Sequence, residues 1–344
     1  MVINMSSTPS VSNVFRPPLG LKNRHFQTIL SSVGPRRVVV GKRFANYAKL
    51  EQKLTLSGGT PSYSDEAVKL EAYFNQATAK AASQLVVLVH GWEGSHTSSY
   101  MKSMTTSLLE AGLDVVRLNL RDHGDTHHLN KNIFNSTMLE EVINAIEDLQ
   151  SRYRYPKYHL AGFSLGGNFC LRVAANAHDR AISFNTVSAF CPAIDAAESN
   201  QVLNQSSNAL YGRYFVRKWK SSLRKKAEQW PDYGFSEQLK TLHTLDELND
   251  ALIPNYTRFD RVNEYFEAYS IAGSALEKTI APCYLHFAED DMIIPVKGVE
   301  RIAKNDNVHI LVTEHGGHCG FLSNWRGDSW QDQRLLEIIR QSNT

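Results

Sequence analysis

The stretch Tyr158-His159-Leu160-Ala161-Gly162-Phe163-Ser164-Leu165-Gly166 decides the fold of this chain. Its first five residues predict a short strand, and residues 165–177 predict a helix, so a G-x-S-x-G turn joins the two. Such a turn is tight and strained, which favours glycines beside a serine whose hydroxyl is pushed out above a sheet. The pattern therefore predicts an α/β fold and marks Ser164 as a candidate nucleophile.

Segments on both sides of this turn alternate between strands and helices. The apolar run at 84–90 is typical of a strand buried on both faces of a parallel sheet. We expect further strands at 114–120, 182–190, 283–288 and 308–313, and helices at 100–111, 138–152, 296–303 and 330–340. This alternation predicts an α/β architecture with a mostly parallel central sheet and helices on both faces.

Two segments fall outside the alternation. Residues 1–17 predict a flexible arm, because Pro17 and Pro18 end any regular element there. Residues from about 196 to 276 are polar and aromatic and contain no buried-strand run. We interpret them as a mainly helical cap inserted into a single domain that spans residues 18–344.

Composition places the chain among globular proteins. Of its 344 residues 42% are hydrophobic and 21% are charged, and the net charge is +2, which excludes global disorder and argues against nucleic-acid binding. The four cysteines include no CxxC pair, so we expect buried, reduced thiols. No run approaches about 18 apolar residues, and the N-terminus lacks the apolar core of a secretory signal. We expect a cytoplasmic protein.

A serine nucleophile needs a base that is itself oriented by a carboxylate. On this architecture the partners follow in the order Ser, acid, His. Three acid candidates, Glu289, Asp290 and Asp291, come directly after the expected strand at 283–288. They lie where α/β proteins gather their functional groups, at the end of a sheet strand.

The base candidates are His315 and His318, which follow the expected strand at 308–313. Gly317 and Gly320 flank His318 and allow the loop to fold its imidazole back over the sheet, so we assign His318 as the general base. Cys319 invites a Cys–His interpretation, but no activating turn precedes it, and we expect the adjacent side chains to diverge.

The loop 90–94 follows the first buried strand, where this architecture places one backbone donor for an oxyanion. We expect the N–H groups of Trp92 and Leu165 to form the oxyanion hole. We also expect His90, Phe163 and Phe321 to line the substrate site.

These motifs resemble the α/β-hydrolase fold superfamily and, within it, the YheT-like group of predicted esterases and acyltransferases. Four stretches carry the resemblance: 23–28 (NRHFQT), 90–95 (HGWEGS), 162–168 (GFSLGGN) and 316–321 (GGHCGF). The similarity extends from about residue 15 to about residue 340. The resemblance favours Asp291 as the acid, because this residue has the family's D-x-x-x-P spacing to Pro295.

The loop after the expected strand at 114–120 departs from the family pattern. Residues 121–125 read RDHGD where relatives have a glycine-rich loop, and His127 and His128 follow. We weigh three interpretations: a metal site, for which the spacing fits no known motif, a substrate-lining or hydrogen-bonded loop, and a solvated surface.

The stretch 211–230 combines aromatic residues at helical spacing with many lysines and arginines. A basic amphipathic helix of this kind can lie on an anionic membrane surface. The alternative, which we favour, is a cap helix that packs its apolar stripe on the main domain.

The sequence predicts a serine carboxylic-ester hydrolase that acts through an acyl-enzyme, with Ser164, His318 and Asp291 as its triad. We expect a small-molecule or lipid acyl ester as substrate, no metal or organic cofactor, no nucleic-acid partner and, in the minority view, peripheral membrane contact. An acyltransferase with the same triad and a non-catalytic binding protein on the same fold are the alternatives.

Overall fold

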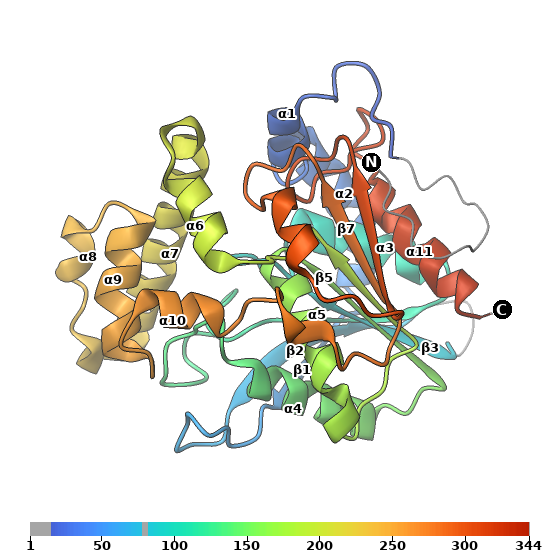
Figure 1. Ribbon diagram of the computed structural model, residues 1–344. Coiled ribbons are helices and arrows are strands. Elements are labelled where there is room, and N and C mark those ends of the chain that lie inside the picture. Colours follow the sequence, from blue (N-terminus) through green and yellow to red (C-terminus); the bar gives the residue numbers. More distant parts are fainter. Residues whose placement is uncertain (1–14, 78–81, 344) are drawn as a thin grey trace.

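The computed structural model describes residues 15–77 and 82–343. Its eight described strands form one sheet in the order β1-β2-β4-β3-β5-β6-β7-β8 (Figure 1). The strands are β1 (Gln52–Ser57), β2 (Lys69–Asn75), β3 (Gln84–Val89), β4 (Asp114–Leu118), β5 (Lys157–Phe163), β6 (Thr186–Phe190), β7 (Cys283–Ala288) and β8 (Val308–Thr313). β1 and β2 are antiparallel to their neighbours, and all other pairs are parallel. The predicted mostly parallel sheet is confirmed.

Helices cover both faces of this sheet because its central strands are apolar on both sides. In β3, Leu85 and Val87 belong to one hydrophobic cluster, whereas Val86 and Leu88 belong to another, as the two-residue period of a strand requires. The first cluster includes residues of α4 (Leu139–Arg152) and α5 (Leu165–Asn176), and the second includes residues of α3 (Ser99–Glu110) and α11 (Trp330–Gln341).

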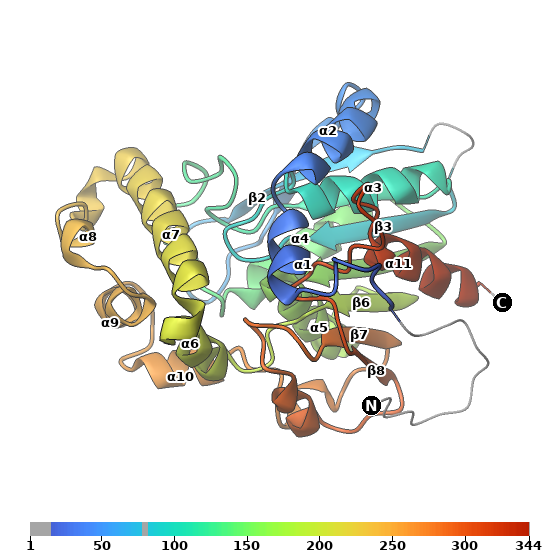
Figure 2. The same ribbon diagram turned by 90° about the horizontal axis from the view of Figure 1, so that it is seen from above.

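The cap (residues 196–276) is helical. It contains α6 (Ala196–Asn204), α7 (Ala209–Gln229), α8 (Gln238–Thr241), α9 (Leu245–Tyr256) and α10 (Val262–Glu267). These helices gather on one side of the molecule in both ribbon views (Figures 1 and 2). The chain enters the cap after β6 and returns to the sheet at β7.

The N-terminal part of the chain differs from expectation. Residues 1–14 of the predicted flexible arm lie outside the described residues, but Phe15 is buried against the rings of Phe321 and Trp330. Phe15 and Pro17 therefore pack on the body, whereas Arg16 is exposed. Two helices follow that we did not predict, α1 (Arg24–Leu30) and α2 (Pro35–Ala48).

Four elements of the sheet region were also mispredicted. β1 was missed because this outer strand keeps most of its side chains exposed and lacks a buried apolar run. β2 is mostly buried, but it reads KLEAYFN, in which Lys69, Glu71 and Asn75 interrupt the apolar residues. The expected helix at 296–303 is a 3-10 helix, Val296–Arg301, which follows Pro295 and contains Gly298. The expected strand at 182–190 begins only at Thr186.

Candidate active site

Ser164 stands at the turn between β5 and α5. Its backbone lies in the left-handed region, with φ 53° and ψ −121°, a strained conformation for a residue with a side chain. The Ser164 N–H donates to the Phe190 carbonyl at 2.8 Å and holds the turn in place. A Cβ at Gly166 would lie 2.3 Å from the His90 carbonyl oxygen. Glycine is therefore required where the helix starts against the end of β3.

The structure brings Ser164, His318 and Asp291 together. His318 Nε2 lies 2.9 Å from Ser164 Oγ, and His318 Nδ1 lies 2.9 Å from Asp291 Oδ2. The other Asp291 oxygen accepts the N–H groups of Ile293 and Ile294 at 2.8 and 3.0 Å. With its side chain only 2% exposed, the Asp291 carboxylate is fixed by backbone donors and aimed at the imidazole.

Asp291, and not its neighbour Asp290, faces His318. Asp290 Oδ1 accepts the Gly317 N–H at 2.8 Å, and its other oxygen lies 3.8 Å from His315 Nδ1. Asp290 and His315 thus form a separate contact that supports the loop. Burial raises the pKa of the Asp290 carboxyl.

Electrostatics at His318 favour the imidazolium. Burial, the largest influence, would lower the pKa of this imidazole, but the facing Asp291 carboxylate and the neighbouring Cys319 together hold the pKa well above its usual value. A histidine in this setting gains a proton from a neighbouring hydroxyl more readily than an isolated one.

The loop after β3 lies against Ser164. A Cβ at Gly91 would lie 3.3 Å from Ser164 Cβ, and the Gly91 N–H donates to the Tyr100 hydroxyl at 3.0 Å. Among the described residues, the N–H groups of Trp92 and Leu165 donate to no protein acceptor. Two free backbone donors on the elements that meet at Ser164 are what an oxyanion hole requires.

Three expected lining residues are corrected. His90, Phe163 and Phe321 are 0%, 1% and 0% exposed, so they do not face a substrate. His90, just after β3, accepts the Leu120 N–H through its Nε2 at 3.1 Å, in a buried contact. Phe163 stacks on Phe190, and Phe321 packs on Phe15. The side chains at strand and loop ends point into the core here, and the sequence does not show which way they turn.

Helix α1 holds the histidine loop, a role that we did not predict. Thr28 Oγ1 accepts the His318 N–H at 2.9 Å. Gln27 is fully buried, and its side chain both accepts from the Leu322 N–H at 2.7 Å and donates to the Leu322 carbonyl at 3.3 Å. The NRHFQT motif carried the family resemblance. Its first residue, Asn23, caps the N-terminus of α1 and is the signal from which the sequence could have predicted this helix.

The same helix also contacts the cap. His25 Nδ1 lies 3.0 Å from the Tyr211 hydroxyl at the start of α7, and the two rings are stacked. Helix α1 therefore lies between the histidine loop and the cap, in contact with both.

Cys319 lies closer to His318 than we expected. Among the described residues, one side-chain atom each of Cys191, His318 and Cys319 lies within 4.8 Å of the others. Both cysteines have positive φ, 46° for Cys191 and 55° for Cys319. This backbone conformation turns the Cys319 thiol toward its neighbours, so the expected divergence of the adjacent side chains is wrong.

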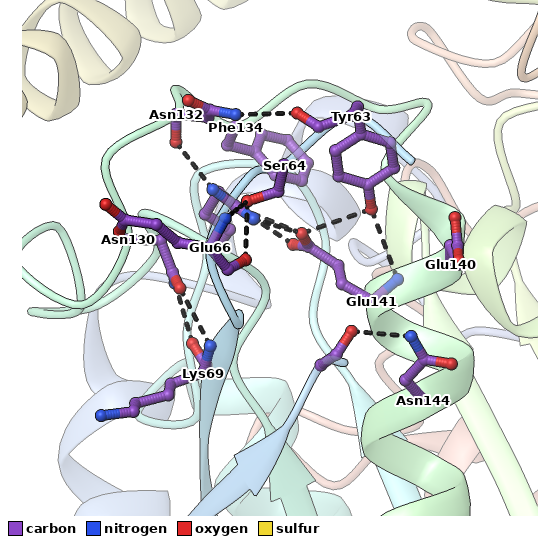
Figure 3. A network of polar contacts seen from close by, with 12 residues as sticks. Tyr63, Ser64, Glu66, Lys69, Asn130, Asn132, Phe134, Glu140, Glu141 and Asn144 are labelled. Atoms are coloured by element: carbon purple, nitrogen blue, oxygen red, sulfur yellow. Dashed lines mark hydrogen bonds and ion pairs between the residues drawn. The ribbon is translucent and has the colours of Figure 1, made fainter. Parts of the chain in front are cut away.

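The loop after β4, residues 119–137, is fixed by hydrogen bonds and ion pairs. Asn130 accepts from and donates to the backbone of Lys69, and Asn132 donates to the Tyr63 carbonyl (Figure 3). Arg121 forms a buried ion pair with Glu141 at 2.6 Å. Within residues 121–128 the hydrogen-bonded interpretation fits the buried Asp122, His123 and His127, whereas Asp125 and His128 are exposed, as the solvated interpretation expects.

The RDHGD part of this loop anchors the cap. Lys226 of α7 is buried and forms an ion pair with the buried Asp122 at 2.8 Å. His127 Nε2 lies 2.8 Å from Ser222 Oγ, and the Trp230 indole donates to the His127 carbonyl. No metal-ligand grouping of this loop occurs among the described residues.

The aromatic stripe of α7 faces protein. The Trp92 ring stacks on Phe215 at 5.2 Å and meets Trp219 edge-on at 5.3 Å, while Leu223 and Ala227 are buried. This favours the packed cap helix over a helix that inserts its aromatic side into a membrane. In the described part of the chain, no helix combines the length and apolar character needed to cross a bilayer.

Comparisons with known proteins agree with this architecture. The model of the alpha/beta hydrolase family matches residues 86–327. The chain is 26% identical to "Putative esterase YheT" of Escherichia coli, covering 96% of this chain and 94% of that protein, and 22% identical to mouse "Phospholipase ABHD3", covering 96% and 79%. The solved structure of the Pyrococcus furiosus esterase Pf2001 shares the fold, with a TM-score of 0.54, 15% identity and coverage of 85% and 92%.

Proposed function

Since this chain belongs to the alpha/beta hydrolase family, we propose that it is a serine hydrolase that cleaves carboxylic esters through an acyl-enzyme. The observation that carries the proposal is the hydrogen-bonded series from Ser164 Oγ through the His318 imidazole to the Asp291 carboxylate. Esterase- and lipase-type relatives support hydrolysis as the general chemistry.

In the proposed reaction Ser164 Oγ attacks the acyl carbonyl carbon while His318 Nε2 takes the hydroxyl proton. The carbonyl oxygen becomes an oxyanion and accepts the N–H groups of Trp92 and Leu165. His318 then gives its proton to the leaving alkoxide, which departs as an alcohol. Asp291 stabilises the transient imidazolium and keeps Nε2 aimed at the serine.

Deacylation repeats these steps with water. His318 Nε2 takes a proton from a water molecule as its oxygen attacks the acyl carbon, and the proton passes to Ser164 Oγ when the acid leaves. The chain's own residues supply the nucleophile, the base and the oxyanion donors of this cycle.

The substrate we propose is a short- to medium-chain acyl ester or a lipid. Three half-buried aromatic rings, those of Trp92, Phe215 and Trp219, gather beside the proposed oxyanion loop. Rings in such a place offer an apolar surface to an acyl chain. The relative whose name specifies a phospholipase is consistent with a lipid ester.

Intact-mass analysis after incubation with a fluorophosphonate tests the proposal. The wild type should gain one adduct and Ser164→Ala none, while Ser221→Ala, an exposed serine of α7, should label like the wild type. A panel of p-nitrophenyl esters of increasing chain length then ranks the acyl groups. A folded wild type that neither labels nor turns over any ester would contradict the proposal.

A further inference from the structure

We propose that Cys191, His318 and Cys319 form a binding site for a thiophilic divalent metal ion, namely zinc. We propose further that a bound ion inhibits ester hydrolysis. The site itself rests on the geometry of these three side chains. Its inhibitory effect rests on the proposed function, in which His318 is the base.

The donor atoms are the kind that zinc prefers. Two cysteine sulfurs and one imidazole nitrogen make a common zinc ligand set, and thiolates select soft cations over magnesium or calcium. With Zn–S bonds of about 2.3 Å and Zn–N bonds of about 2.0–2.1 Å, ligand atoms of a tetrahedral site lie about 3.5–3.8 Å apart. The three ligand atoms already lie within 4.8 Å of one another, so shifts of about 1 Å close the site around an ion.

The backbone holds both thiols in place. The Cys191 N–H donates to the His286 carbonyl at 2.7 Å at the end of β6, and the Cys319 N–H points at Cys191 Sγ at 3.4 Å. Neither thiol is part of a disulfide. A ligand set that is arranged before the ion arrives loses little entropy when it binds.

The remaining zinc position is open. Three protein ligands leave one tetrahedral corner for a water molecule. The His318 side chain keeps 10% exposure, whereas Cys191 and Cys319 are 0% and 7% exposed, so an ion would reach the thiols past the imidazole. Binding converts the two thiols to thiolates and releases their protons to water.

A metal ion at this position removes the base. His318 Nε2 faces Ser164 Oγ and Nδ1 faces Asp291 Oδ2, so both ring nitrogens are in use in the proposed mechanism. An ion that takes Nε2 displaces the serine, and an ion that takes Nδ1 displaces the carboxylate. Either way the imidazole can no longer accept the serine proton.

Cobalt absorption tests binding without any need for activity. Ser164→Ala protein titrated with Co²⁺ should show the thiolate-to-cobalt charge-transfer band, and added Zn²⁺ should remove it by competition. In the Ser164→Ala background, a second substitution, Cys191→Ser or Cys319→Ser, should weaken Co²⁺ binding by at least about 10-fold. Changes to groups around a metal site cost at least that much affinity. Cys283→Ser is the matched control, because Cys283 is equally buried but lies outside the cluster. The proposed site would be refuted if the Ser164→Ala protein showed no charge-transfer band. It would also be refuted if the Cys191→Ser and Cys319→Ser variants bound Co²⁺ as tightly as the Cys283→Ser control.

Ester turnover then tests inhibition. Zn²⁺ should inhibit the wild type and the Cys283→Ser variant at the same concentration, and Cys191→Ser should need at least about 10-fold more. Equal sensitivity of Cys191→Ser and wild type would refute inhibition through this site. If the wild type has no turnover while cobalt still binds, the proposed function has failed and the metal site stands.

Discussion

Thr28→Val tests whether helix α1 positions the proposed base. Thr28 Oγ1 accepts the His318 N–H at 2.9 Å and donates to the Arg24 carbonyl at 2.9 Å within the helix. Valine has nearly the same shape as threonine but cannot accept a hydrogen bond. The substitution therefore removes one restraint on the histidine loop and leaves Ser164 and Asp291 untouched.

The size of the effect follows from that one hydrogen bond. A neutral, partly buried hydrogen bond contributes about 0.5–1.5 kcal/mol. If the whole loss falls on the position of the imidazole, kcat/KM drops by about 2- to 12-fold, with KM little changed. Thr28→Ser keeps the acceptor, so we expect it to retain wild-type activity.

Steady-state hydrolysis of a p-nitrophenyl ester, measured across pH together with urea unfolding, checks this reasoning. We expect Thr28→Val to lose turnover by more than its change in stability explains, because 1 kcal/mol of unfolding free energy leaves nearly all of the protein folded. Thr28→Val and Thr28→Ser with equal, wild-type kcat would refute a positioning role for α1.

Three further outcomes are expected. Asp291→Asn should lower kcat by about 10⁴-fold, the effect of the same exchange in a serine protease, since it stabilises the wrong imidazole tautomer; activity close to wild type would contradict Asp291 as the acid. The acid limb of kcat/KM should lie above pH 6.5, because the pKa of His318 is raised and its imidazolium cannot accept a proton, and Asp291→Asn should move that limb down. Lys226→Met should destabilise the protein by about 3–5 kcal/mol in urea unfolding, because it leaves the Asp122 carboxylate buried without its partner. Lys225→Met, whose partner is exposed, should change stability little, and equal effects of both lysines would refute this reasoning.

The sequence predicted two kinds of feature: the serine turn, which a local pattern encodes, and side chains that follow the ends of sheet strands. The G-x-S-x-G turn is encoded within five residues, and the structure has Ser164 in the strained conformation that such a turn implies. Asp291 and His318 could be found because each follows a recognisable apolar strand, buried in β7 and half-buried in β8. The carboxyl ends of parallel strands meet at one sheet edge. Their geometry was thus accessible from sequence, while their catalytic roles stay predictions.

The missed contacts join parts of the chain that no local pattern links. The hydrogen bond between Thr28 and His318 spans 290 residues, and Cys191 meets Cys319 from 128 residues away. The expected lining role of His90 failed for a related reason. A strand-end side chain points to either face, and in this protein the backbone of Leu120 provides a buried partner.

Helix α1 contacts the proposed active site although it lies outside the part of the chain that matches the family model. The family model begins at residue 86, so it includes the proposed nucleophile, acid and base but not α1. Yet α1 binds the histidine loop through Gln27 and Thr28 and the cap through His25. A shift of α1 would therefore move the base and the start of α7 together. It follows that the core matched by the family model holds the proposed triad, while residues 23–28 bind both the loop of the proposed base and the cap.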